Sequence, residues 1–483
     1  MQLTGLRRYW KTLIVYFCVV TAAGVSLSSC QRKGEPANQN SVTNKSVDQE
    51  RVMLVDPGDE PSGIAYYEAI LNELDLNPNK LSGKQLVDAT DLPQLMTFLG
   101  YGDLNLRDIE DSPSAELMKR FPEDILSAGF FAPKITDVSV TPINPGWRKV
   151  VRFKAKGDAA KKGISAAYLL FNKFQGVTEA DYDNAPFGKN SKESKNTQLI
   201  LVRAAVGADL KYPIYFLVFN AFSDHSKLIT FLTATFDARA PNIVAENKYY
   251  VPNACADCHG GLTEGETPSP EYAKLKLNYL DTDHWFDRLE DDFAFLKKHT
   301  CGRSAPCPVL YDAEDASQFE KAFDVFRKLN SEIQEQNSKV EPADSFQLRA
   351  VTKWIDLHKA DSSHKDVFAR ALSPTVAGGE PWKADVSPDK DLLPLMNRYC
   401  FRCHSSLRYS IFDRPAVVGE KKNILRFMTL DIKNPLKMPQ DRNLDCWLAD
   451  KEKILDLVRL LPGPTPPPKP TPSPTCPTSS PSP

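Results

Sequence analysis

Two pairs of cysteines, each followed directly by a histidine, are the residues of this chain best suited to carry chemistry. The segments 255–259 and 400–404 both have the pattern Cys-x-x-Cys-His. Two thiols about one helical turn apart can form thioether bonds to the vinyl groups of a haem, and the next histidine can bind its iron. We therefore expect two covalently bound haem c groups. Their thiols are Cys255, Cys258, Cys400 and Cys403, and their iron-binding histidines are His259 and His404.

The alternative for either motif is a redox-active dithiol or half of a zinc site, with the histidine as a bystander. A zinc site needs its other ligands at suitable spacing. Two widely separated pairs, each followed by histidine, fit haem better.

The N-terminus has the features of an export signal. Basic residues within 7–11 precede an apolar run over residues 13–27, which is typical of a secretory signal. Because c-type haem is attached after export, this signal supports the haem interpretation. The ending Leu27-Ser28-Ser29-Cys30 resembles a bacterial lipobox, which implies a lipid on Cys30 that anchors the protein to a membrane.

The alternative is an uncleaved transmembrane helix, although the apolar run is shorter than the roughly 20 residues that a span needs. In both cases the body of the protein lies outside the cytoplasm. Gln31 after the cysteine resembles an outer-membrane address. We therefore expect a lipid-anchored protein of the bacterial cell envelope, on the periplasmic side of the outer membrane.

Composition limits the class of partner. The chain has 483 residues, 42% of them hydrophobic, which is enough for two or three domains with their own cores. Lys and Arg number 60 and Asp and Glu 62, so we expect no nucleic-acid partner. Cys301 and Cys307 could close a small disulfide loop. Cys446 and Cys476 either form a second disulfide or are free thiols.

The hydrophobic pattern predicts a multidomain α+β protein, in which an antiparallel β domain precedes mostly α-helical c-type cytochrome domains. Helical spacing continues to about Ile125, and the β domain could be a sandwich. The expected strands cover residues 135–141, 149–153, 167–171, 198–202, 214–222 and 228–236. The expected parts are a signal peptide (1–30), a polar tether (31–59), a helical segment (60–133), the β domain (134–250), a first haem domain (251–390), a second haem domain (391–461) and a Pro-rich disordered tail (462–483).

A methionine near the C-terminus is a candidate for the sixth ligand of the second iron. Met438-Pro439 follows the second motif and precedes an expected terminal helix from about Asp450. This order resembles a class I cytochrome c domain over residues 392–461. The resemblance implies that Met438 binds the iron and that the last helix packs across the helix bearing the cysteines. Met396 and Met428 are the rivals.

The first haem departs from that pattern, because no methionine lies between His259 and Met396. We expect His284, in a helix-starting context, as its sixth ligand. His358 is the next candidate, although a histidine on that apolar stripe is more often a core residue. An open iron is the third possibility, and the remaining candidates are His299, His364 and His225.

These features favour an electron-transfer protein with a protein donor, a protein acceptor and a membrane anchor at Cys30. A methionine ligand raises the reduction potential of the second haem relative to histidine. The spacing of the motifs also resembles bacterial di-haem cytochrome c peroxidases, which implies an alternative: a peroxidase or oxidase with an open first iron. A third hypothesis makes the β domain a docking module for a partner enzyme. Whether the chain is an enzyme stays open at this point.

Overall fold

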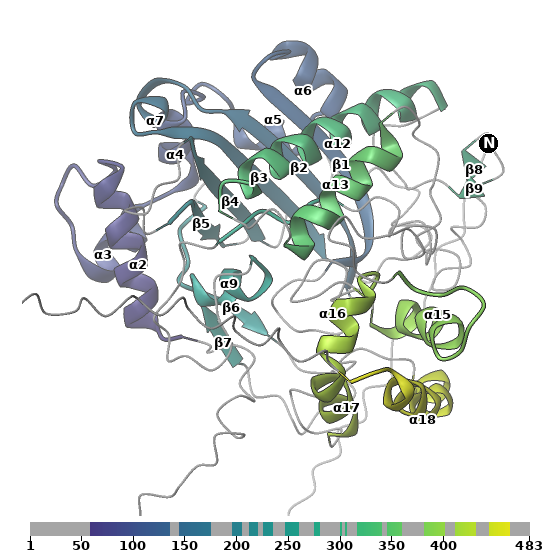
Figure 1. Cartoon of the computed structure of the whole chain (residues 1–483). Coiled ribbons are helices and arrows are strands. Elements are labelled where there is room, and N and C mark those ends of the chain that lie inside the picture. Colours follow the sequence, from purple (N-terminus) through teal and green to yellow (C-terminus); the bar gives the residue numbers. More distant parts are fainter. Residues whose placement is uncertain are drawn as a thin grey trace, which may run out of the picture. The chain divides into compact units, whose positions relative to one another are not determined.

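The computed structural model describes residues 58–135, 144–174, 196–204, 212–220, 226–234, 247–259, 275–280, 300–301, 305–306, 316–340, 345–359, 381–400, 411–430 and 444–463. The expected signal peptide, nearly all of the tether and all but the start of the Pro-rich tail lie outside these residues. The described part combines an antiparallel sheet with helices, which confirms a mixed α+β fold (Figure 1). The division into cytochrome domains stays a prediction.

A five-stranded sheet lies at the centre of the described part. Its strands pair in chain order and are all antiparallel. They are β1 (Ile125–Ile135), β2 (Asn144–Lys154), β3 (Ile164–Phe174), β4 (Asn196–Arg203) and β5 (Ile214–Phe219). Runs of β-branched and aromatic residues favour these strands, and antiparallel neighbours along the chain can pair without a crossover connection.

Two expectations about this region are corrected. β1 begins at Ile125, so the expected helical segment was wrong for residues 125–133. Pairing with β2, with Ile125 opposite Phe153, decides this conformation, and single-sequence periodicity does not contain that partner. Five of the described strands also form one sheet packed against helices, rather than one half of a sandwich of two large sheets. Within residues 228–236, β6 (Phe231–Ala234) pairs separately with β7 (Asn247–Tyr250).

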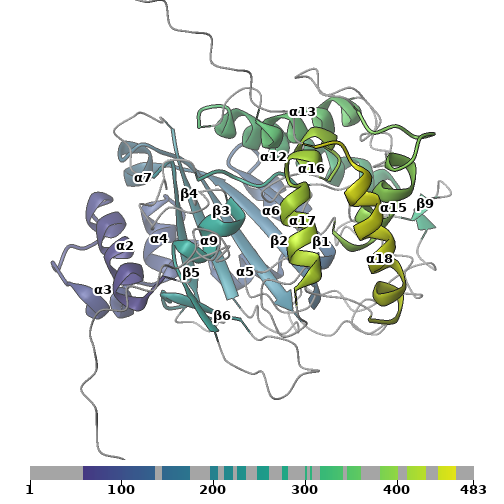
Figure 2. The same ribbon diagram turned by 60° about the horizontal axis from the view of Figure 1, so that its bottom comes forward.

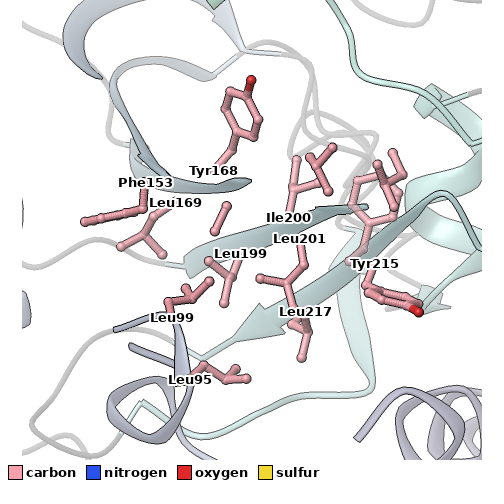
Figure 3. Close-up of a cluster of buried hydrophobic side chains, with 14 of the residues drawn as sticks. Leu95, Leu99, Phe153, Tyr168, Leu169, Leu199, Ile200, Leu201, Tyr215 and Leu217 are labelled. Carbon is pink, nitrogen blue, oxygen red and sulfur yellow. The ribbon is translucent and has the colours of Figure 1, made fainter. Parts of the chain in front are cut away.

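The N-terminal helices pack against one face and one edge of the sheet. They are α2 (Glu60–Glu73), α3 (Gly83–Ala89), α4 (Leu92–Phe98), α5 (Leu106–Asp111) and α6 (Ser114–Arg120). Figure 3 shows Leu199 and Leu217 of the sheet pointing toward Leu95 and Leu99, whereas Tyr168 points to the opposite side. Side chains alternate between the two faces of a strand, so residues at odd and even positions serve different helical layers.

A second group of helices covers the opposite face. It contains α9 (Asn253–His259), α12 (Ala316–Asn337) and α13 (Phe346–His358), of which α12 and α13 cross the sheet in Figure 1. The rings of Phe130 on β1 and Phe326 on α12 are 5.9 Å apart. Glu332 of α12 pairs with Arg152 of β2 and accepts a hydrogen bond from Tyr168 on β3 at 3.2 Å.

The C-terminal helices have a hydrophobic cluster of their own. They are α15 (Asp389–Tyr399), α16 (Arg414–Gly419), α17 (Lys421–Thr429) and α18 (Leu444–Leu460), and Figure 2 shows them from a second direction. α18 packs against α15 and α17, with Leu392 and Met396 in the same buried cluster as Ile454 and Val458. The helix that ends at the second motif is therefore in contact with the terminal helix.

The described residues include only one cysteine of each possible disulfide pair. Cys301 lies in β8 (Thr300–Cys301), which pairs with β9 (Ala305–Pro306) so that Cys301 is opposite Ala305. Cys307 and Cys476 lie outside the described residues, and Cys446 falls within α18. The pairing of Cys301 with Cys307 stays a prediction, as do the two alternatives for Cys446 and Cys476, a second pair or free thiols.

Candidate functional site

The first cysteine motif forms a short helix directly after β7. α9 spans Asn253–His259, and the amides of Cys255 and Ala256 donate to the carbonyl of Pro252 at 2.9 and 2.8 Å. Cys255 is buried. In this helix positions 255 and 258 are three residues apart, which is about one turn. The local structure therefore has the spacing that attachment of haem through two thioethers requires.

His259 is held by a reciprocal pair of hydrogen bonds to Lys276. Its Nδ1 lies 2.7 Å from the Lys276 carbonyl, and the Lys276 amide donates to the His259 carbonyl at 3.0 Å. Because a carbonyl can only accept, Nδ1 carries the proton and Nε2 keeps its lone pair. Histidines that bind metals commonly donate their other ring N–H to such an acceptor. The geometry therefore fits a histidine whose Nε2 binds iron.

The surroundings of His259 favour its neutral form. Its ring centroid is 4.6 Å from that of Phe216 on β5. The pKa of His259 is lowered to about 4, mainly by burial and also by the charges of Arg148 and Lys276, while the hydrogen bond to the Lys276 carbonyl opposes the shift. A neutral imidazole is the form that binds a metal.

The sequence did not predict that Arg148, Phe216 and Lys276 surround His259. Arg148 and Phe216 belong to the sheet, and Arg148 donates through Nε to Asn172 on β3 at 2.7 Å. Lys276 contributes only its backbone to these hydrogen bonds, so its side chain carried no signal. The alternation of the strands could have placed Arg148 and Phe216 on one face, but not beside a particular histidine.

His358 lies in an aromatic cluster at the end of α13. It is fully buried, with its ring centroid 5.1 Å from Phe323 and 4.7 Å from Trp354. Its carbonyl accepts a hydrogen bond from Arg327 at 2.7 Å. His358 is therefore packed as a residue of the hydrophobic core. His284, His299, His364 and His225 lie outside the described residues, so the expected sixth ligand of the first iron stays a prediction.

The second motif is described only at its first residue. Cys400 caps the C-terminus of α15, and its amide donates to the Met396 carbonyl at 2.7 Å. Cys403, His404 and Met438 lie outside the described residues. The two rivals of Met438 are both core residues, because Met396 is fully buried and Met428 is 2% exposed in the same cluster.

The described residues hold neither a cluster of metal-binding side chains nor a membrane span. Within these ranges, no three or more His, Cys, Asp and Glu side chains gather closely enough to hold a metal ion. Nor does any helix of the described part have the length and apolar character needed to span a bilayer. Comparisons of the chain with protein-family models, curated proteins and solved structures found no match.

Proposed function

We propose that this chain is a di-haem c-type cytochrome that transfers electrons between redox partners in the bacterial cell envelope. The observation that carries the proposal is the geometry at the end of α9. There, a cysteine pair with one-turn spacing leads into a histidine whose Nδ1 is hydrogen-bonded to the Lys276 carbonyl at 2.7 Å. A redox dithiol needs no such orientation of the histidine that follows it.

The chain's own residues divide the work between attachment and iron binding. Cys255 and Cys258 would hold the first haem, and His259 would bind its iron through Nε2, with His284 as the proposed second protein ligand. Cys400 and Cys403 would hold the second haem, with His404 and Met438 as its ligands. Each bound haem supplies one-electron redox chemistry, and the protein tunes its potential through the ligands and their hydrogen bonds.

The direction of transfer follows from the ligands. A histidine and methionine pair gives the second haem a higher potential than a haem with two histidines. Electrons are therefore expected to enter from a donor protein at the first haem and leave to an acceptor protein from the second. A lipid on Cys30 would anchor the protein, so that it meets both redox partners at the membrane surface. We propose that this surface is the periplasmic side of the outer membrane.

The decisive experiment is to count covalent haems in exported protein. Wild type is compared with Cys255→Ser/Cys258→Ser and Cys400→Ser/Cys403→Ser by intact mass and by the absorbance of haem c in alkaline pyridine. We expect two haems in wild type and one in each variant. Exported wild type without haem would overturn the proposal, and zinc bound in equal amounts would favour the alternative zinc site.

The same protein distinguishes an electron carrier from an enzyme. Electron paramagnetic resonance of the oxidised protein should give two low-spin irons that do not react with cyanide or peroxide. A high-spin iron that binds cyanide would instead support a di-haem peroxidase or oxidase with an open first iron. The control is the variant that lacks Cys255 and Cys258, in which any cyanide-binding signal of the first haem must disappear.

A further inference from the structure

We infer that Asn330 and Asn337 of α12 are positioning residues for His259, because they clamp the backbone that holds its hydrogen-bond acceptor. The inference rests on the proposed function, in which His259 binds the iron of the first haem. It assigns to α12, which lies outside both cysteine motifs, control over the orientation and potential of that haem.

The two asparagines bind one extended segment through four hydrogen bonds. Asn337 accepts from the Leu277 amide at 2.9 Å and donates to the Leu277 carbonyl at 2.7 Å. Asn330 accepts from the Leu280 amide at 2.7 Å and donates to the Leu280 carbonyl at 2.9 Å. Each side-chain amide therefore pairs with both backbone groups of one residue, much as a neighbouring strand would.

The spacing of the asparagines matches the segment that they bind. Positions 330 and 337 are two turns apart, so they lie on one face of α12 and are separated by about 10.5 Å along its axis. Three residues of extended chain span about 10 Å, which is the step from Leu277 to Leu280. The segment runs antiparallel to α12, because Asn337 binds Leu277 and Asn330 binds Leu280.

Burial makes this clamp stiff. Asn330 is fully buried and Asn337 is 2% exposed, so water does not compete for their hydrogen bonds. A buried amide or backbone group that loses its partner retains a desolvation penalty, which opposes any shift of the segment. Lys276 precedes Leu277 directly, and both of its backbone groups bind His259. A displacement of Leu277 therefore moves the acceptor of the imidazole N–H.

This acceptor influences the electronic properties of the ligand. A short bond from Nδ1–H to a carbonyl makes the imidazole a stronger donor to the metal. Stronger donation stabilises oxidised iron and lowers the reduction potential. If the Lys276 backbone shifts, the bond weakens and the potential of the first haem rises, while the second haem is unaffected.

The test compares Asn337→Ala and Asn330→Ala with Gln334→Ala. Gln334 lies on the same helix and donates to Thr352 at 2.7 Å, so its loss perturbs α12 without touching residues 275–280. In a spectroelectrochemical titration, Asn337→Ala should raise the potential of the first haem, and Asn330→Ala should raise it less, because it binds farther from Lys276. Gln334→Ala should leave it unchanged. The second haem serves as the internal reference.

Unchanged potentials in both asparagine variants, with both haems attached, would overturn the inference and leave the proposed function standing. Wild type without haem would instead overturn the proposed function. If Asn337→Ala does not fold, Asn337→Asp is the substitute, because it keeps the acceptor for the Leu277 amide and loses the donor to the Leu277 carbonyl. This variant should also raise the reduction potential of the first haem. In haem-free protein, faster exchange of the His259 Nδ1 proton in the Asn337 variants, measured by nitrogen-15 resonance, supports the clamp without a bound haem. Equal exchange rates count against it.

Discussion

At the scale of single residues, Lys149 is the clearest case of a charge placed inside the protein. Its side chain is fully buried on β2, and Nζ donates to the carbonyls of Ile109 at 2.7 Å, Glu110 at 3.0 Å and Ser112. These carbonyls lie at and just after the C-terminal end of α5, where a helix favours a cation. The lysine therefore satisfies backbone groups that the sheet would otherwise bury without partners.

Replacing this lysine by an apolar residue of similar length should be costly. Lys149→Met leaves three carbonyls without their donor, and we expect the free energy of unfolding in urea to fall by about 3 kcal/mol. The matched control is Lys154→Met on the same strand, where the side chain is exposed and the expected change is below about 0.5 kcal/mol. Equal effects of the two variants would show that the buried ammonium contributes little.

A second residue-scale prediction concerns the proposed ligand Met438. Under the proposed function, Met438→His should lower the reduction potential of the second haem, because a second histidine stabilises oxidised iron more than a thioether does. Both covalent attachments should remain, as intact mass can verify. Met428→Leu is the control, since Met428 is a buried core residue of α17. An unchanged potential in Met438→His would remove Met438 as the ligand.

At the scale of elements, α2 protects an edge of the sheet. The Tyr66 hydroxyl accepts from the Phe216 amide at 2.8 Å, and that of Tyr67 accepts from Val218 at 3.3 Å and donates to Ile229 at 2.8 Å. The two hydroxyls thus accept hydrogen bonds from β5 amides that are not paired with β4. An edge strand with unpaired amides invites pairing with other chains, and this helix prevents it.

The same tyrosines predict an alkaline limit of stability. Burial raises the pKa of Tyr66 and Tyr67 well above its usual value, so the folded protein holds these protons more tightly than the unfolded chain. The contribution of these two protons to the free energy of unfolding is therefore fully present below about pH 10. It falls as the pH rises further, by about 1.4 kcal/mol per pH unit for each tyrosine. Urea titrations across this range should show the loss. In Tyr66→Phe/Tyr67→Phe, stability near pH 7 should be lower but its decline above pH 10 shallower; an equally steep decline would assign the effect to other tyrosines.

The end of α4 depends on a glycine. Gly100 has φ of +88°, and the Tyr101 amide donates to the Met96 carbonyl at 2.8 Å, which together form a Schellman motif. A Cβ at Gly100 would lie 2.8 Å from Cβ of Lys156.

Alanine at this position should therefore suffer both from backbone strain and from a clash. We expect Gly100→Ala to lower the free energy of unfolding by about 3 kcal/mol. Gly83→Ala separates the two causes, because Gly83 has φ of +59° but no atom within 4 Å of the position that a Cβ would take, so about 1 kcal/mol is expected there. If both variants lose the same amount, the contact with Lys156 costs nothing.

At the scale of the whole molecule, the buried side chains of the described part form two clusters with no member in common. One contains the sheet with the helices on its two faces, and the other contains α15 to α18. Cooperative unfolding arises within a shared core, so separate cores are able to melt separately.

We therefore expect two transitions in a calorimetric scan of the purified protein. Leu217→Ala removes a fully buried side chain of the sheet and should destabilise one transition, by roughly 3 kcal/mol. Val458→Ala in α18 should lower only the other transition. A single transition that both variants shift would mean that the two clusters unfold as one unit.

The chemistry proposed for the two Cys-x-x-Cys-His motifs rests on the sequence itself, because the spacing of Cys255, Cys258 and His259 is a local property. The short runs of β-branched and aromatic residues likewise predicted the central parts of β2 to β4 and all of β5, and an apolar stripe predicted α18, which begins at Leu444 rather than at about Asp450. Such patterns depend on the side chains of a few consecutive residues. Met396 could be ranked below Met438 by its place just before the second motif, and Met428 by its apolar neighbours.

Only the tertiary structure decided what surrounds those residues. β1 is a strand from Ile125 because β2 pairs with it, and the carbonyl that orients His259 belongs to Lys276, 17 residues farther along. Asn337, which holds that segment, lies another 60 residues beyond Leu277. A backbone carbonyl has no side-chain signature, and its partner is chosen by packing between distant elements. The acceptor of the His259 proton is therefore a property of the fold and not of the motif.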